Sequence, residues 1–329
     1  MGLSTVFFKN KPRIASTFTI AGPKEGSSVF GKHIHELLQD DRFDEDTFEK
    51  AECKMLSTCI RKTIENANLN VEDINAMISG DLLNQIISAS FAARDFSFPY
   101  IGVYNACSTF SEALALSAIF VDGGYMKNVI AATGSHFATA ERQYRYPLEL
   151  GSTRPPQSQW TVTGAGGALV TDKGNFPKIV SATFGKVVDF GITDANNMGA
   201  AMAPAACETL VTLLRETKTE PKDYDLILSG DLGALGSRLL KELVKKRGYD
   251  IENHADCGEM IYNIEEEEYQ GGSGAGCSAV VFGSYVYRKL LKKEIKRMIF
   301  MATGALLSSI STQQGESIPG ISHAVVIES

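Results

Sequence analysis

Short apolar runs alternate along the chain with longer stretches whose apolar side chains recur at helical spacing. Residues 74–79, 99–104 and 128–133 are short and apolar, as buried strands are. Residues 44–66 and 113–121 place their apolar side chains on one side of a helix. Alternation of this kind predicts an α/β fold in which helices cover a largely parallel sheet.

The stretches between these elements are predicted to be less regular. Residues 1–50 are expected to form an irregular lead-in with one short strand at 17–20. The glycines of residues 161–171 predict a strand that another backbone approaches closely. Residues 134–158 and 191–206 are predicted to be loops that cover a site.

The second half of the chain repeats patterns of the first half in the same order. Each match combines an apolar strand with its turn residues, or a cysteine with the helix that follows it. The matches are residues 224–232 with 74–82, residues 297–304 with 127–134, and Cys277-Ser278 with Cys107-Ser108. Matches that recur in one order indicate an internal duplication.

The duplication predicts two similar α/β halves, residues 1–175 and residues 176–329. Equivalent helix starts of the two halves would face one pocket. The Cys107 loop would enter this pocket from the first half, and the glycine-rich loop 271–276 from the second half. Glycines allow a backbone to present N–H groups to a ligand, although the same glycines could serve tight packing alone.

Cys107 lies shortly before the predicted helix 113–121. Ser108 and Thr109 occupy positions at which a helix starts and is capped. The Cys107 thiol would then lie at the positive end of the helix, where N–H groups and the macrodipole stabilise a thiolate or a bound anion. A cysteine in this position can be a nucleophile, one wall of a binding site or a packing residue.

Composition and charge exclude several classes of protein. The 329 residues carry a net charge of −7, and no Lys/Arg run is long enough to suggest nucleic acid as the main partner. The densest basic stretch, residues 288–297, is predicted to be a solvated helix face, with a surface for anionic lipid or a partner as the alternative. The acidic run 265–268 is predicted to be a solvated loop or a docking site for membrane partners.

Six cysteines are scattered along the chain without paired spacing, so neither a disulfide framework nor a zinc site is expected. No apolar stretch reaches the ~18 residues that a membrane span needs. The first residues do not resemble a secretory signal, because Lys9, Lys11 and Arg13 interrupt short apolar pieces. We therefore expect a cytoplasmic protein that reaches a membrane only through a partner.

These features resemble the thiolase/ketoacyl-synthase superfamily, in which duplicated α/β halves present a cysteine at a helix start. More narrowly, six segments resemble the stage V sporulation protein AD family of spore-forming bacteria. The segments are residues 79–85, 106–109, 138–143, 145–147, 198–206 and 302–308. The resemblance implies a thiolase-like fold with a layered αβαβα architecture. It also implies a protein that binds dipicolinic acid, without a cofactor, and helps to load it into the forespore.

The same resemblance implies partners and a location. The ligand would be dipicolinic acid or its calcium chelate, and the protein partners would be membrane proteins of the same sporulation channel complex. The protein would lie in the forespore, associated peripherally with the spore inner membrane through those partners. Superfamily analogy also suggests a homodimer.

An enzyme of this superfamily needs more than a thiolate. Its second half supplies a histidine and then an asparagine or histidine, which stabilise the thioester oxyanion. At the corresponding positions this chain has Asp231 and either Gly272 or Ser273. An acidic Asp231 would oppose an oxyanion, so we expect no catalytic residues and no enzyme. The alternatives are an acyltransferase that uses Cys107 as its nucleophile, and an assembly scaffold with a vestigial pocket.

Dipicolinate is a flat pyridine ring with two carboxylates, and helix starts and hydroxyl groups can hold such a dianion. Arg142 and Arg145 can bind a carboxylate through a planar guanidinium fork, or form ion pairs within their own loop. Asp81 can line the site, cap a helix, or join Asp231 in binding calcium if calcium arrives with the ligand. No dedicated metal site is expected. The expected ligand-binding residues are Cys107, Ser108, Thr109, Asp81, Asn84, His136, Arg142, Arg145, Gly272 and Ser273.

Overall fold

The computed structural model of the chain describes residues 4–145, 150–151, 153–262 and 270–329. The acidic run 265–268 lies outside the described residues, so its predicted role stays a prediction. Within the described residues, no helix is both long enough and apolar enough to cross a bilayer.

The first half of the chain builds one group of five strands in the order β2-β8-β6-β4-β5. β8 runs antiparallel to both of its neighbours, whereas β4 runs parallel to β6 and β5. The main elements of this half are β2 (Arg13–Ala21), α2 (Phe48–Asn66), β4 (Ala76–Gly80), β5 (Tyr100–Gly102), α4 (Thr109–Asp122), β6 (Asn128–Ser135) and β8 (Gly164–Thr171).

The second half builds a second group with the equivalent order β9-β14-β13-β10-β11. β14 is antiparallel to both neighbours, and β10 is parallel to β13 and β11, so the two halves have the same strand order, as the sequence repeat predicts. The two groups touch where Arg13 of β2 pairs with Lys178 of β9. The elements are β9 (Lys178–Phe184), α6 (Met198–Thr217), β10 (Leu226–Gly230), α7 (Gly233–Lys246), β11 (His254–Asp256), α9 (Ala275–Val281), α10 (Tyr287–Leu291), β13 (Arg297–Ala305) and β14 (Gly320–Glu328).

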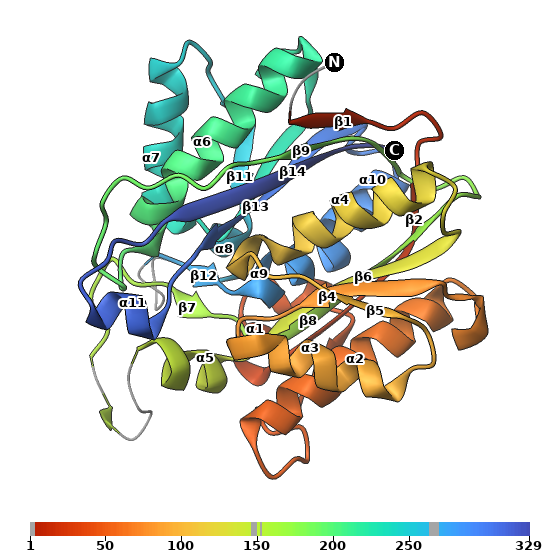
Figure 1. Cartoon of the computed structure of the whole chain (residues 1–329), viewed down its shortest axis with the longest axis horizontal. Helices are drawn as coiled ribbons and strands as arrows, with labels where there is room; N and C mark the ends of the chain where they lie inside the picture. The colour runs from red at the N-terminus through yellow and green to blue at the C-terminus, as the bar shows by residue number, and fades with distance from the viewer. Residues whose placement is uncertain (1–3, 146–149, 152, 263–269) are drawn as a thin grey trace.

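Helices and strands are stacked in five layers (Figure 1). α4 and α9 lie in the middle layer, because α4 contacts β6 and β14 while α9 contacts β8 and β10. α2 covers the outer face of the first group of strands, and α6 packs on β13 and β14 of the second group with α7 beside it. The predicted α/β class with a layered αβαβα architecture is confirmed.

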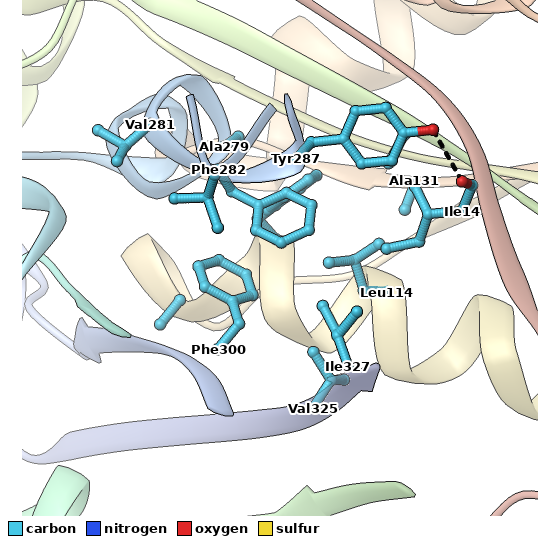
Figure 2. Packing of buried hydrophobic residues seen from close by; sticks show 14 of the residues in the cluster. Ile14, Leu114, Ala131, Ala279, Val281, Phe282, Tyr287, Phe300, Val325 and Ile327 are labelled. Atoms are coloured by element: carbon cyan, nitrogen blue, oxygen red, sulfur yellow. Dashed lines mark hydrogen bonds between the residues drawn. The ribbon is translucent and has the colours of Figure 1, made fainter. Parts of the chain in front are cut away.

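The middle layer explains why α4 is apolar almost all around. A helix enclosed by two sheets has no solvated face, so most of α4 is buried. Figure 2 shows Leu114 of α4 close to Phe282 and Phe300, and the Tyr287 hydroxyl donating to the Ile14 carbonyl oxygen at 2.9 Å. Each aromatic side chain buried there stabilises the fold by roughly 2–3 kcal/mol through its lost contact with water.

The prediction of an irregular lead-in at residues 1–50 is wrong. The segment contains β1 (Thr5–Phe7), the long buried strand β2, α1 (Pro23–Ser27), a 3-10 turn at Gly31–His33 and β3 (Glu36–Leu37). β2 is rich in hydroxyl residues, which hides its burial in the sequence. In the fold these hydroxyls have partners, because Ser16 donates to the Thr63 carbonyl oxygen and Thr17 to that of Gly283, each at 2.7 Å.

Two of the predicted loops contain helices. Residues 134–158 include α5 (Phe137–Tyr144), and residues 191–206 include the first turns of α6. Both helices begin at a capping side chain, His136 for α5 and Asn197 for α6. Neither cap was predicted, because the glycine, alanine and polar residues that follow them are also typical of loops.

Candidate functional site

The starts of α4 and α9 meet at one end of the middle layer. A 3-10 turn, η5 (Ala106–Ser108), leads into α4 and contacts both α9 and β13. The turn is tight, since Ala106 has a positive φ of 49°. Gly304 of β13 makes room for it, because a Cβ at this position would lie 2.2 Å from the Asn105 carbonyl oxygen. The predicted convergence of the two helix starts is therefore present.

A pocket opens at this junction, with an empty volume of about 400 Å³ that includes the part open to solvent. Its wall is mostly apolar, with one cation, one thiol and a few hydroxyl groups. The lining residues are Leu82, Tyr104, Ala106, Cys107, Ala140, Tyr144, Arg145, Thr161, Met198, Ser273, Gly274, Ala305 and Leu307. Both halves of the chain contribute to it.

Arg145 is the charged residue of this pocket wall. Its side chain is only 6% exposed and pairs with the buried carboxylate of Glu141. Arg154 binds the same carboxylate at 2.7 Å, so two guanidinium groups share one carboxylate and the group has a net positive charge. The buried Nε–H of Arg145 has no hydrogen-bond partner among the described residues. Burial lowers the pKa of Arg145, whereas Glu141 acts in the opposite direction.

Cys107 lines the pocket as predicted, but the prediction of a stabilised thiolate is wrong. Burial raises the pKa of the Cys107 thiol well above its usual value, and the neighbouring carboxyl of Asp231 raises it further. The backbone N–H of Gly274 and the charge of Arg145 act in the opposite direction and are weaker. Burial and Asp231 therefore outweigh these two effects and favour the neutral thiol.

Asp231 connects the two halves behind the pocket. It is fully buried, has a positive φ of 72°, and accepts the Gly274 N–H at 3.1 Å. The thiols of Cys107 and Cys277, which are equivalent in the repeat, both lie near its carboxyl group, which raises the pKa of each thiol in addition to burial. Its Oδ1 has no partner within hydrogen-bonding distance in the described residues. Burial raises the pKa of Asp231 well above its usual value.

Ser108 and Thr109 hold the Cys107 turn in place and do not line the pocket. The prediction that their side chains cap α4 is wrong, because the helix start has no side-chain cap. Ser108 Oγ instead donates to the Ala302 carbonyl oxygen at 2.9 Å and accepts the His323 N–H at 3.1 Å. Thr109 Oγ1 donates to the Ala106 carbonyl oxygen at 2.6 Å. Ser108 therefore ties the first half to strands of the second half.

Asp81 and Asn84 follow β4 but take different roles. Asp81 is buried and accepts the N–H groups of Leu83 and Ala89, each at 2.7 Å, so it holds the first turn of α3 (Ile87–Ala92) from outside the helix. Burial raises the pKa of Asp81 to about 6. Asn84 is exposed and lines a second hollow, which shares Tyr104 with the pocket. Asp81 does not line the pocket, and the N-cap residue of α3 is Ile86 and not Asp81.

His136 and Arg142 lie outside the pocket lining. His136 Nδ1 accepts the Ala138 N–H at 3.1 Å at the start of α5, and Nε2 lies 2.7 Å from the Asp41 carbonyl oxygen. Burial lowers the pKa of His136. Arg142 forms an ion pair with Glu49 and is about 40% exposed. Of the two arginines, Arg145 reaches the pocket and Arg142 forms the ion pair that was its alternative role.

Gly272 and Ser273 form β12, which pairs with β7 (Trp160–Thr161). Ser273 lines the pocket, whereas the Gly272 carbonyl oxygen accepts the Gln159 side chain at 2.9 Å. Sequence reasoning missed this small sheet, because each of its strands has two residues and carries no periodicity. Within the described residues, no group of three or more His, Cys, Asp or Glu is arranged to hold a metal ion.

The tyrosine pair at the pocket was also missed. The hydroxyl groups of Tyr104 and Tyr144 lie 3.2 Å apart, and Tyr144 donates to the Leu82 carbonyl oxygen. Both tyrosines lie close to residues that the sequence did single out, since Tyr104 precedes the cysteine turn and Tyr144 precedes Arg145. Their place in these segments was the available signal.

Comparisons with known proteins agree on family and fold. A family model described as Stage V sporulation protein AD matches residues 2–328. Stage V sporulation protein AD of Bacillus subtilis (strain 168) is 40% identical over 328 residues, which cover 99% of this chain and 97% of that protein. The solved 3-oxoacyl-[acyl-carrier-protein] synthase III from Aquifex aeolicus VF5 superposes with a TM-score of 0.57 at 15% identity, covering 97% of this chain and 100% of that chain. Acetamide-bound OleA from Xanthomonas campestris superposes with a TM-score of 0.61 at 13% identity, covering 98% of this chain and 100% of that chain. At these identities the two solved structures show the thiolase-like fold alone.

Proposed function

The chain belongs to the stage V sporulation protein AD family, and from this premise we propose that its pocket binds dipicolinic acid for uptake into the developing spore. Membership in the family is consistent with a role in sporulation. The observation that carries the more specific proposal is Arg145, a buried cation on the pocket wall whose Nε–H has no partner in the described structure.

The charge of the pocket wall favours an anionic ligand. Arg145 and Arg154 share the carboxylate of Glu141, which leaves one positive charge uncompensated in a buried place. A buried charge without a partner is costly, and a ligand carboxylate would supply one. The guanidinium fork of Arg145 also matches the planar geometry of a carboxylate.

The remaining wall suits a flat ring. Leu82, Met198 and Leu307 provide apolar surface. Ser273, which belongs to the second half of the chain, adds a hydroxyl group to the lining. An apolar pocket with a few polar groups is the usual form of a small-molecule site. Dipicolinate combines the two requirements, since it is an aromatic ring with carboxylates at its edge.

The proposal includes that the protein is not an enzyme. A protonated Cys107 thiol beside the carboxyl of Asp231 is a poor nucleophile, because the thiolate is the reactive form. His323 lies near the turn, but its ring nitrogens face Asn105 at 3.1 Å and the Gly185 N–H at 3.2 Å. These contacts give no support to the alternative of an acyltransferase. Incubation with acyl-CoA followed by intact mass measurement should therefore show no adduct on Cys107.

From the same family membership we also propose the partners and the location of the protein. Membrane proteins of the same sporulation channel complex would receive the ligand, and the protein would lie at the spore inner membrane on the forespore pathway. Free dipicolinic acid and its calcium chelate are both candidate ligands. A pocket wall with a net positive charge favours the free dicarboxylate, because the chelate is neutral.

Titration calorimetry with dipicolinate tests the proposal. We expect binding by the unmodified protein, and a roughly 10- to 100-fold weaker affinity for the Arg145→Met variant, because a hydrogen bond to a charged group contributes about 1.5–3 kcal/mol. Arg142→Met is the matched control, since Arg142 is an exposed arginine of the same segment that pairs with Glu49. Its affinity should equal that of the unmodified protein.

Ligand analogues sharpen the test. Isophthalate has the same two carboxylates without the ring nitrogen, and picolinate has the nitrogen with one carboxylate. The proposed pocket should bind isophthalate more tightly than picolinate if carboxylate contacts dominate. Absence of heat with millimolar dipicolinate, with and without calcium, would refute the proposal, and equal losses in the Arg145→Met and Arg142→Met variants would refute the assigned role of Arg145.

A further inference from the structure

A strongly basic surface lies at the end of α10. Residues 288–297 contain six Lys and Arg and a single Glu, a net charge of +5 in a chain whose total is −7. The stretch holds six of the 32 Lys and Arg of the chain, and the remainder of the protein is acidic. Such an asymmetry favours one orientation toward an anionic partner.

The fold adds a second segment to this surface. The Arg288 side chain donates to the His33 carbonyl oxygen at 2.6 Å, and the His33 ring lies 4.7 Å from that of Tyr285. Lys32 is therefore a neighbour of α10 although it is far away in sequence. The pKa of His33 is lowered first by burial and then by the positive charges of Lys32, Arg288 and Lys289.

Several of these cations have no acidic partner. Lys289 pairs with Glu294 at 3.5 Å, and Arg297 pairs with Glu328 at 3.6 Å. Four exposed lysines form no ion pair with any residue that the structure describes; they are Lys32, Lys292, Lys293 and Lys296. We call these four lysines, together with Leu291, the basic end surface.

Favourable contact with a helix dipole does not account for the whole surface. Cations near the last turn of a helix stabilise its negative end, which explains Lys292 beside the end of α10. Lys296 lies beyond the turn that follows α10, and Lys32 lies in another segment of the chain. Leu291 lies among these lysines and is 48% exposed, so it offers an apolar side chain within the charged surface.

We propose that the basic end surface binds directly to a membrane that contains anionic phospholipids. Lysines on flexible stems attract a negatively charged bilayer surface without needing a fixed geometry, and an exposed leucine among them can enter the interface. A nucleic acid would offer Leu291 no apolar environment, and its long charged backbone would meet the acidic remainder of the chain. The bilayer is therefore the occupant that both the charge and the apolar side chain favour.

The fold then determines how the pocket is oriented relative to the membrane. α9, a short π-helical segment and α10 form one helical run from Ala275 at the pocket to Leu291 at the basic end surface. At 1.5 Å per residue this run is about 25 Å long. Figure 1 shows α10 on the opposite side of the molecule from α5 and β7, which flank the pocket. A protein docked through this surface would hold its pocket on the aqueous side.

Vesicle sedimentation with the purified full chain tests this proposal without any partner protein. Vesicles of phosphatidylcholine alone are compared with vesicles that also contain phosphatidylglycerol. We expect binding to the anionic vesicles only, and its loss when salt rises from about 0.1 M to about 1 M, because the screening length falls from about 10 Å to about 3 Å.

Two triple variants separate a specific surface from overall charge. Lys292→Glu/Lys293→Glu/Lys296→Glu should weaken binding roughly 100-fold or more, since each lysine near the surface contributes about a fivefold factor. Lys241→Glu/Lys245→Glu/Lys246→Glu changes the net charge by the same amount at exposed positions of α7 and should bind as the unmodified protein does. Leu291→Ser should weaken binding while leaving its salt dependence unchanged.

Thermal denaturation of each variant confirms that it is folded. The proposal is overturned if the unmodified protein does not sediment with anionic vesicles, or if the two triple variants lose binding equally. Retention on duplex DNA at the same salt, without vesicle binding, would assign the surface to nucleic acid instead and would also overturn it.

Discussion

Glu25 offers a sharp test of how this fold treats buried carboxyl groups. It lies in α1 directly after β2 and is fully buried. Its Oε1 accepts the Thr163 N–H at 3.1 Å and the hydroxyl group of Tyr262, whereas Oε2 has no partner within the described part of the chain. A Cβ built on Gly22 would lie 2.9 Å from Oε2 and 3.0 Å from Asp41 Oδ1, so these two oxygen atoms are near each other. Oε2 is thus an unpaired carboxyl oxygen in the neighbourhood of a second carboxyl group.

The Glu25→Gln variant replaces the unpaired oxygen Oε2 by an amide nitrogen. The amide oxygen can keep the two hydrogen bonds of Oε1, and the amide nitrogen can donate to Asp41 where a carboxylate would be repelled. Burial raises the pKa of Glu25 from 4.5 to about 7, with hydrogen bonds opposing the shift and Asp41 adding to it. A raised pKa means that Glu25 favours the folded state at low pH, and that this stability is lost as the pH rises through about 7.

Raising the pKa of Glu25 from 4.5 to about 7 corresponds to a free-energy difference of about 3 kcal/mol. We therefore expect the free energy of unfolding of Glu25→Gln, relative to the unmodified protein, to increase by about 3 kcal/mol between about pH 4.5 and about pH 8. Urea denaturation at both pH values measures it, with Glu72→Gln as the control at an exposed position. A difference that does not change with pH, or that is equal for both variants, would refute the reasoning.

Three further outcomes follow from the site. Native protein treated with iodoacetamide near neutral pH should be alkylated at the half-buried Cys53 before the buried Cys107, and peptide mass mapping that finds Cys107 modified first would contradict the protonated thiol. Ser108→Ala should lose about 1–3 kcal/mol of unfolding free energy in urea while binding dipicolinate unchanged, because Ser108 joins the two halves and does not line the pocket. Gly304→Ala should lower the melting temperature by several degrees, since its Cβ would lie 2.2 Å from the Asn105 carbonyl oxygen; an unchanged melting temperature would argue against the tight approach of β13 to the turn.

The features that the sequence predicted well are local ones. Strands β4 and β6 and their repeats β10 and β13 have apolar runs that end in turn residues, and both signals lie within a few positions. The position of Cys107 before a helix is local in the same sense. The duplication could be recognised because equal local patterns return in equal order.

The features that were missed depend on partners far away in sequence. Ser108 was expected to cap its own helix, but its hydroxyl group bonds Ala302, 194 positions later. The burial of β2 was hidden because its hydroxyl residues are satisfied by distant carbonyl groups, such as that of Gly283 for Thr17. The pKa of the Cys107 thiol is raised first by burial and then by the buried carboxyl of Asp231 in the other half. Local periodicity carries no information on such contacts.

The difference between the two equivalent helix starts explains where the pocket lies. Cys107 and Cys277 both lie near the carboxyl of Asp231, but Cys277 is completely enclosed, whereas Cys107 borders the pocket. The Gly276 N–H at the start of α9 is covered by Ser135 of β6 at 3.0 Å. At the start of α4 the neighbouring side chains leave space instead, and the segment between β6 and β8 lies against that space.

This segment breaks the symmetry of the duplication. Residues 136–163 connect β6 to β8, whereas only residues 306–319 connect the equivalent strands β13 and β14. The longer segment contributes Tyr144 and Arg145 to the pocket wall, and the Arg154 that shares Glu141 with Arg145 belongs to it as well. The duplicated fold therefore provides two helix starts and a buried carboxyl group, and the longer segment of the first half provides the positive charge of the pocket wall. Exchanging residues within this segment should change which ligand binds while leaving the thiolase-like fold intact.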